Sequence, residues 1–156
     1  MNLQPGTFLQ NAPGLDDPNF NDAMLFITEH NANGAVGFVI NRLFNRALNE
    51  LEEFSQSIAF PLYEGGPVDK EHLYFIHRRP DRIEGGSPVA GNLYFGGNFQ
   101  QAVSSINKGT VNQQDIKIFI GYCGWDAGEL EAEIAEGGWL LVENELSLVF
   151  APPATS

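Results

Sequence analysis

Cys123 is the only cysteine of the chain, and it lies in the stretch Gly121-Tyr-Cys-Gly-Trp125. A strand is predicted to end here and a helix to follow, which matches a nucleophile elbow except that Trp125 replaces the final glycine. A thiolate at this place would need a base, which His30 or His77 would supply if the fold brought one of them close. A lone cysteine between aromatic residues is more typical of a small buried apolar side chain. We favour that interpretation and predict no catalytic residue.

Three glutamates, Glu129, Glu131 and Glu133, lie in a helix predicted over residues 129–135. In a helix only Glu129 and Glu133 share a face. Two carboxylates at that spacing could hold Mg²⁺ or act as acid and base. Acidic side chains in a first helical turn also complement the helix dipole without any ligand. We favour this structural role and predict neither a metal nor a cofactor.

All five arginines fall in two clusters, Asn41-Arg42 with Arg46, and the run HRRPDR at 77–82. The planar fork of an arginine suits carboxylate or phosphate groups, and Gly65-Gly66 would let backbone N–H groups approach such an anion. Neither G-x-G-x-x-G nor a P-loop is present. Because carboxylates outnumber the arginines, we favour surface ion pairs over a specific anion site.

Short strands and helices must position these residues. Met24–Ile27 and Ala35–Ile40 are apolar on successive residues and flank Asn33-Gly34, which predicts a central antiparallel hairpin. Further strands are predicted at 73–76, 93–95, 116–122, 139–142 and 146–150, and helices after the caps Asn45 and Asn98 and at 129–135. This irregular order predicts a single α+β domain over 1–150 with a mobile tail at 151–156.

The composition restricts the partners. The chain has 156 residues, 43% of them hydrophobic, with 8 Lys+Arg against 20 Asp+Glu, a net charge of −12. The electrostatic field of this negative net charge repels phosphate backbones and anionic lipids, so we expect no direct binding to nucleic acid or membrane. The chain has no apolar run of transmembrane length, and its start does not match a signal peptide. With a single cysteine, this predicts a cytoplasmic protein.

Four stretches of the chain, in order, are distinctive: APGLDDPNF at 12–20, GAVGFVINR at 34–42, YEGGPV at 63–68 with LYFIH at 73–77, and GYCGWDAGELEAEI at 121–134. Together they resemble the YqgE/AlgH family of bacterial proteins. The resemblance implies an α+β fold in which mixed, bifurcated β-sheets form a small closed barrel flanked by helices. The family is largely uncharacterised, and its transcriptional-regulator label derives from a genetic association with alginate production.

The chain departs from the family pattern in three places. Glu129 stands where the family usually has Gln, which replaces an amide donor with a carboxylate. Cys123 occupies a position that more often carries a small residue, and the chain ends at Ser156, before a further C-terminal segment that members commonly have. These departures weaken any role that requires the amide or the thiol.

Polar and glycine residues at the ends of buried strands are expected to line one shared cleft of a non-catalytic binding or regulatory protein. The eight candidates are Asn41, Arg42, Gly65, Gly66, His77, Tyr122, Trp125 and Glu129. The expected partner is a protein or a small anionic ligand, and the expected state is a monomer or a small homo-oligomer. The alternative is a hydrolase or transferase that uses Cys123 with a histidine, or Glu129 and Glu133 with a metal.

Overall fold

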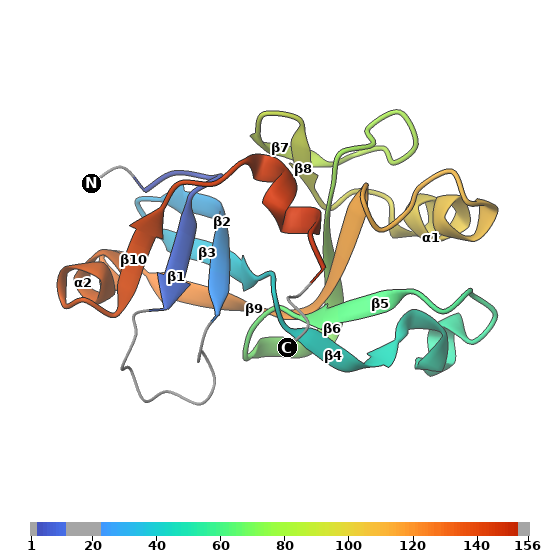
Figure 1. Cartoon of the computed structure of the whole chain (residues 1–156), viewed down its shortest axis with the longest axis horizontal. Coiled ribbons are helices and arrows are strands. Elements are labelled where there is room, and N and C mark those ends of the chain that lie inside the picture. Colours follow the sequence, from blue (N-terminus) through green and yellow to red (C-terminus); the bar gives the residue numbers. More distant parts are fainter. Residues whose placement is uncertain (1–2, 12–22, 153–156) are drawn as a thin grey trace.

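The computed structural model describes residues 3–11 and 23–152, and in this part of the chain ten strands form one mostly antiparallel sheet accompanied by two α-helices (Figure 1). The strands are β1 (Phe8–Asn11), β2 (Met24–Asn31), β3 (Gly34–Val39), β4 (Leu43–Ala47), β5 (Pro61–Glu64), β6 (Val68–His77), β7 (Ser87–Ala90), β8 (Leu93–Phe95), β9 (Ile116–Asp126) and β10 (Trp139–Val142). The helices are α1 (Phe99–Lys108) and α2 (Glu129–Ala135), with 3₁₀ turns η1 (Leu48–Glu50), η2 (Glu52–Phe54) and η3 (Leu146–Phe150). The predicted α+β class is confirmed.

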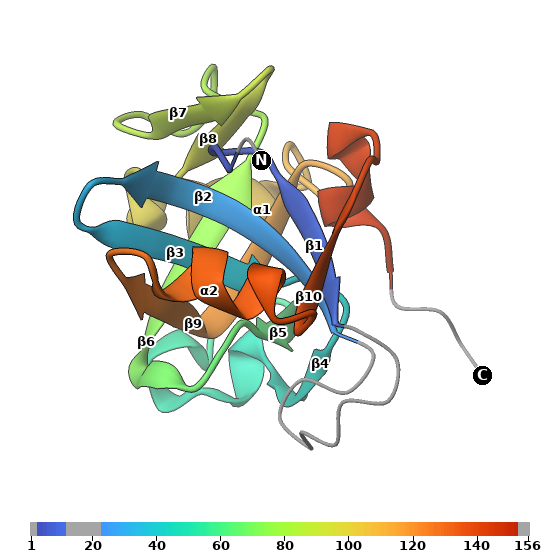
Figure 2. The same cartoon turned by 90° about the vertical axis from the view of Figure 1, so that its left-hand side faces the viewer.

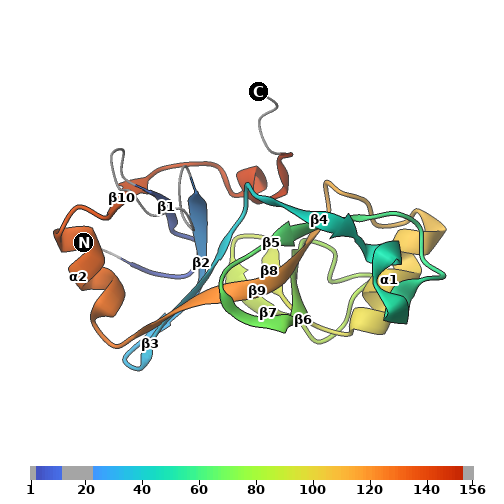
Figure 3. The ribbon, with the colours of Figure 1, turned by 90° about the horizontal axis from the view of Figure 1, so that it is seen from below.

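Strand β9 belongs to two groups of strands at once. Its second half pairs with β3, while its first half lies between β6, which is antiparallel to it, and β5, which is parallel to it. The strands β10, β1, β2 and β3 with the second half of β9 are called the α2 wing. The strands β4, β5, β6, β7 and β8 with the first half of β9 are called the α1 wing. Figure 3 shows β9 running through both wings.

The sheet is open, so the predicted closed barrel is wrong. The strand order β10-β1-β2-β3-β9-β6-β8-β7 ends on β10 and β7, which do not pair with each other in the described ladders. A barrel requires its first and last strands to pair. Here the sheet divides at β9 instead. The second half of this strand pairs with β3, and the first half pairs with β5.

Each wing has its own buried apolar cluster. Helix α1 packs Ala102 and Ile106 onto Ile116 and Ile118 of the α1 wing. In the α2 wing, Leu130 of α2 packs with the buried side chains of β2 and β3, and Figure 2 shows α2 lying across β3 and β9. A third cluster, rich in phenylalanine, joins the wings. No helix in the described ranges has both the length and the apolar character to cross a membrane.

The predicted hairpin is confirmed. Strands β2 and β3 pair from Leu25↔Val39 to Asn31↔Gly34, in the middle of the α2 wing. Gly34 has a φ of 139°, and a Cβ atom there would lie 2.0 Å from the carbonyl oxygen of Trp125. Glycine is therefore required at position 34, because β3 and β9 approach each other so closely.

Two predicted helices are confirmed, the first of them with its end signals. Asn98 Oδ1 accepts a hydrogen bond of 3.0 Å from the Gln101 N–H, as an N-cap does, and Gly109 ends α1 with a left-handed φ of 76°. Helix α2 spans residues 129–135, as the sequence predicts.

Two other predicted elements are wrong. Asn45 lies in β4, and the segment after it forms the turns η1 and η2, because the Leu48 N–H donates to the Phe60 carbonyl at 2.8 Å and so ties the chain to a neighbouring segment. The strand predicted at 146–150 is the 3₁₀ turn η3, held by local bonds such as that from the Leu148 N–H to Glu145. Strands β1, β4, β5 and β7 were not predicted.

Two predictions lie wholly or partly outside the described residues. The motif at 12–20 is one of them. The tail predicted at 151–156 is described only for Ala151 and Pro152, and the Ala151 carbonyl accepts a 3.0 Å hydrogen bond from Lys117 Nζ. The mobility of residues 153–156 stays a prediction.

Candidate functional site

Tyr122 and Trp125 point to opposite faces of β9, because side chains alternate along a strand. The Tyr122 ring packs among aromatic residues, 5.5 Å from the Tyr74 ring and 6.5 Å from the Phe38 ring. Trp125 packs on the α2 side and donates its Nε1–H to Glu133 at 2.9 Å. The structure does not bring these two predicted site residues to one surface.

Gly65 and Gly66 lie where the two wings meet, and their small size is explained by the backbone around them. The Gly65 N–H donates to the Ile120 carbonyl at 2.9 Å, and the Gly65 carbonyl accepts from the Val39 N–H at 2.8 Å. A Cβ atom on Gly66 would lie 2.2 Å from the carbonyl carbon of Tyr122. The glycines let strands approach closely, so their presence does not by itself indicate an anion cradle.

Asn41 and Arg42 follow β3 at the same junction. Asn41 Oδ1 accepts from the Met24 N–H at 2.9 Å, and the Arg42 carbonyl accepts from the Glu64 N–H at 2.8 Å. The Arg42 guanidinium is close enough to Cys123 to act on the pKa of that thiol. Asn41, Arg42, Gly65 and Gly66 are thus gathered at the fork of the sheet.

His77 is fully buried at the end of β6, and both of its ring nitrogens are used. Nε2 donates to the Gly96 carbonyl at 3.1 Å, and Nδ1 accepts from the Arg79 N–H at 3.1 Å. Burial also lowers the pKa of His77, which favours the neutral ring. His77 therefore fixes a turn of the backbone and has no nitrogen left for a ligand.

Cys123 lies within β9 and not at the strand-to-helix turn that a nucleophile elbow requires. The residue is 2% exposed, and its Sγ donates to the Gly65 carbonyl at 3.5 Å. Burial raises the pKa of the thiol to about 12, which leaves almost no thiolate at neutral pH. The turn from β9 to α2 comes later, at Gly128, where the φ is 81°.

Glu129 and Glu133 share a helix face, but each has a structural partner. Glu129 Oε1 accepts from the Asp126 N–H at 2.7 Å. Glu133 accepts the indole N–H of Trp125 at one oxygen, at 2.9 Å, and that of Trp139 at the other, at 3.2 Å. A metal ion on this pair would compete with both indoles, so the geometry favours a structural role.

The second arginine cluster forms the surface ion pairs that the charge balance predicts. Arg79 reaches both carboxylate oxygens of Asp81 at 2.9 Å and also Asp115 at 3.3 Å. Arg78 lies 3.6 Å from Asp115, and Arg82 lies 3.8 Å from Asp81. The Arg79 guanidinium holds the pKa of Asp81 below its usual value.

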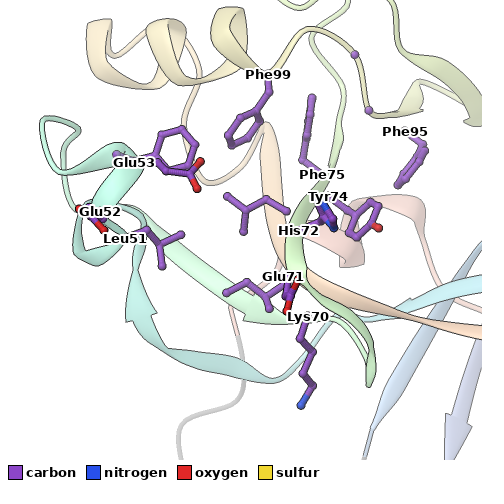
Figure 4. A pocket seen from close by; sticks show the side chains of 15 residues that line it. Leu51, Glu52, Glu53, Lys70, Glu71, His72, Tyr74, Phe75, Phe95 and Phe99 are labelled. Atoms are coloured by element: carbon purple, nitrogen blue, oxygen red, sulfur yellow. The ribbon is translucent and has the colours of Figure 1, made fainter.

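A large pocket lies elsewhere, between η2, β6 and the start of α1, and none of the eight predicted residues lines it (Figure 4). Its volume is about 790 Å³, and we call it the β6 groove. Its apolar lining includes Leu51, Phe54, Leu73, Phe75, Phe99 and Ile120. Sequence reasoning missed the groove because these residues come from four separate segments.

The rim of the β6 groove is acidic. Lys70 is paired with Glu64 at 3.0 Å, and His72 is paired with Asp69 at 2.7 Å. Three rim glutamates have no described cation within ion-pair distance: Glu52, Glu53 and Glu71. The groove thus combines an apolar floor with an excess of negative charge.

One end of the groove is shaped by Asp69, whose φ of 54° is unusual for a residue other than glycine. Its carboxylate accepts the Tyr74 hydroxyl at one oxygen and faces His72 Nδ1 with the other. The hydrogen bond to Asp69 raises the pKa of His72, while burial and Asp69 raise the pKa of Tyr74 to about 12. These bonds hold the His72 and Tyr74 side chains beside the groove.

Comparison with known proteins identifies relatives over almost the whole chain. Residues 8–156 match the family described as AlgH-like. A UPF0301 protein of Chlorobaculum tepidum is 36% identical over 148 residues, which cover 95% of this chain and 79% of that protein. The solution structure of AlgH from Pseudomonas aeruginosa is 30% identical with a TM-score of 0.76, and the match covers 98% of this chain and 86% of that one. Protein DIP2367 of Corynebacterium diphtheriae, 21% identical with a TM-score of 0.79 over 97% of this chain and 82% of its own, shares the fold.

Proposed function

The chain belongs to the AlgH-like family, and we propose that this member is a non-catalytic binding protein that holds a protein partner in the β6 groove. The observation that carries the proposal is the groove itself, about 790 Å³ with an apolar floor. Solvent-accessible apolar hollows with a polar rim mark places where a ligand or partner is bound. Leu73 and Phe99 are only half-buried there, so a partner side chain would remove further apolar surface from water.

The state of three side chains considered for chemistry in the sequence analysis, Cys123, Glu133 and His77, supports binding over catalysis. The Cys123 thiol is buried and protonated at neutral pH, and the carboxylate of Glu133 is engaged by two indoles. His77 has both ring nitrogens occupied. None of these groups lines the β6 groove.

The charge of the rim supports a protein partner in place of the small anionic ligand that the arginines suggested. Glu52, Glu53 and Glu71 would repel a phosphate or carboxylate ligand at the groove. Any regulatory effect would then pass through a bound protein. The free, buried thiol of Cys123 is compatible with a reducing compartment, which supports action in the cytoplasm.

Site-specific photo-crosslinking in cells of the source organism tests the proposal. A photoreactive amino acid replaces Glu53 on the groove rim in one protein and Glu136, exposed at the end of α2, in the matched control. The expected result is a discrete protein adduct from position 53 alone, which Phe99→Ser in the groove floor abolishes. Equal adducts from both positions, or no adduct from position 53, would refute the proposal.

A further inference from the structure

We infer that the partner binds as an added β-strand along the free edge of β6, through an extended segment in which apolar residues alternate with Lys or Arg. This inference rests on the proposed function and specifies the chemistry of the partner. It follows from the backbone of β6, the shape of the groove and the charge on its rim.

One edge of β6 is uncovered next to the groove. The strand pairs with β9 on one edge at Val68 and through Leu73–His77. Its other edge is covered by β8 at Ile76 and His77 and by the Gly96 N–H at the Phe75 carbonyl. Among the described strands, none pairs with that outer edge from Lys70 to Tyr74. An unpaired edge presents backbone donors and acceptors that another strand can satisfy.

The backbone of Leu73 points toward this edge. The Phe75 carbonyl accepts from the Gly96 N–H at 2.8 Å, which places the Phe75 backbone on the outer edge. In an antiparallel pair, alternate residues direct both backbone groups to the same edge, so Leu73 faces outward as well. The residue opposite Leu73 on β9 supports this orientation. The Ile120 carbonyl accepts from the Gly65 N–H at 2.9 Å and so points away from β6, which means that Leu73 and Ile120 are not hydrogen-bonded to each other.

The β6 groove follows this edge. It is lined by the six consecutive residues 70–75, although successive side chains of a strand point to opposite faces. A pocket that contacts both faces of one strand must lie along the edge of that strand. Figure 4 shows the same arrangement, with Leu51 on one side of β6 and Phe95 on the other.

These features select one kind of occupant. An added strand satisfies edge groups with its backbone and places alternate side chains in pockets. The half-buried Leu73 and Phe99 offer contacts for apolar side chains, while Glu53 and Glu71 make no described ion pair and favour basic ones. A second copy of the chain is disfavoured because each carries a net charge of −12.

Binding of a defined peptide to the whole protein provides the test. The probe is a fluorescent Lys-Val-Lys-Phe-Lys-Val-Lys peptide, measured by fluorescence anisotropy. Two further versions carry backbone N-methyl groups either on the lysines or on the apolar residues, and a third replaces every lysine with glutamate. In a bound strand, either the lysines or the apolar residues direct their N–H groups toward β6. N-methylation of that set should weaken peptide binding roughly tenfold, whereas N-methylation of the other set should change the affinity little.

Hydrogen exchange and two matched variants complete the test. Bound peptide should slow exchange of the Leu73 N–H by roughly tenfold or more, because a free edge amide becomes hydrogen-bonded. The pair Glu53→Gln and Glu71→Gln should weaken binding, whereas Glu136→Gln should not.

The outcomes separate this inference from the proposed function. Strand addition would be overturned by equal affinity of the two N-methylated peptides together with an unchanged exchange rate of the Leu73 N–H. In that case a crosslinked adduct from position 53 would still support binding of a protein in the groove. Tighter binding of the glutamate peptide, or no binding of the lysine peptide, would overturn the basic partner. The crosslinking result decides the broader proposal independently.

Discussion

Lys117 Nζ lies 2.7 Å from the carbonyl oxygen of Ile40, and this contact joins β9 to the end of β3 across the fork of the sheet. The lysine is 2% exposed, donates also to the Ala151 carbonyl, and lies 4.0 Å from the centroid of the Tyr63 ring. No described carboxylate is within ion-pair distance of it. A buried cation of this kind makes stability depend on pH.

The first prediction concerns that pH dependence. Burial lowers the pKa of Lys117 to about 7, from 10.5, so between these values the unfolded chain binds more protons than the folded one. The free energy of unfolding should therefore rise with pH across this window, with a contribution of at most about 1.4 kcal/mol per pH unit from this group. Denaturant unfolding at several pH values measures this rise in the free energy of unfolding. The rise should appear in the native protein and in Lys108→Met, an exposed control on α1, and it should be absent from Lys117→Met. An identical slope in all three proteins would contradict the assignment.

Glu133 should be a stability residue, because its carboxylate accepts the indole N–H groups of both Trp125 and Trp139. Glu133→Ala leaves two indoles without their acceptor and should lower the free energy of unfolding by about 1–3 kcal/mol. Glu133→Gln keeps one acceptor oxygen and should lose less. Urea unfolding followed by tryptophan fluorescence measures both, with exposed Glu136→Ala as the control; similar stability of all three variants would refute this role.

Gly66 should tolerate no side chain. A Cβ atom there would meet the Tyr122 backbone at 2.2 Å, and β9 cannot move away without breaking its pairing with β6, in which Tyr122 lies opposite Val68. Gly66→Ala should therefore destabilise the protein by about 3 kcal/mol or prevent folding. Gly124→Ala, whose nearest contact is the Tyr122 ring at 3.3 Å, serves as the control on β9. Thermal unfolding compares the two, and equal melting temperatures would show that the close approach is not needed.

Cys123 should react slowly in the folded protein. With its thiol buried and the pKa raised to about 12, little thiolate forms at neutral pH and reagents have no access. Alkylation by iodoacetamide at pH 7.5, followed by mass spectrometry, should be roughly a hundredfold slower in native protein than in urea. Fast modification of the native protein would restore the nucleophile hypothesis.

Local signals were sufficient for several parts of the fold. The cap at Asn98 and the stop at Gly109 predict α1, because helix ends need those side-chain and backbone conformations whatever surrounds them. The β2–β3 hairpin follows in the same way from two apolar runs around a short turn. The ion pairs of Arg79 were expected from the ratio of carboxylates to arginines alone.

The candidate site depended on tertiary structure. Ile116–Ile120 reads as an ordinary buried strand, and nothing local shows that it pairs with β5 and β6 while Cys123–Asp126 pairs with β3. Tyr122 and Trp125 point to opposite faces of β9, and the packing of the two wings places them in different apolar clusters. Among the described strands, none covers the outer edge of β6 from Lys70 to Tyr74.

Sequence by itself determined the family, the α+β class, the acidic charge and the main local elements, since each follows from residue type and short-range spacing. Only the tertiary structure decided that the sheet is open, that Lys117 and His77 are buried, and that the β6 groove exists. The physical reason is that burial and edge exposure are set by pairings between residues far apart in the chain, and such pairings leave no periodic signal in the sequence.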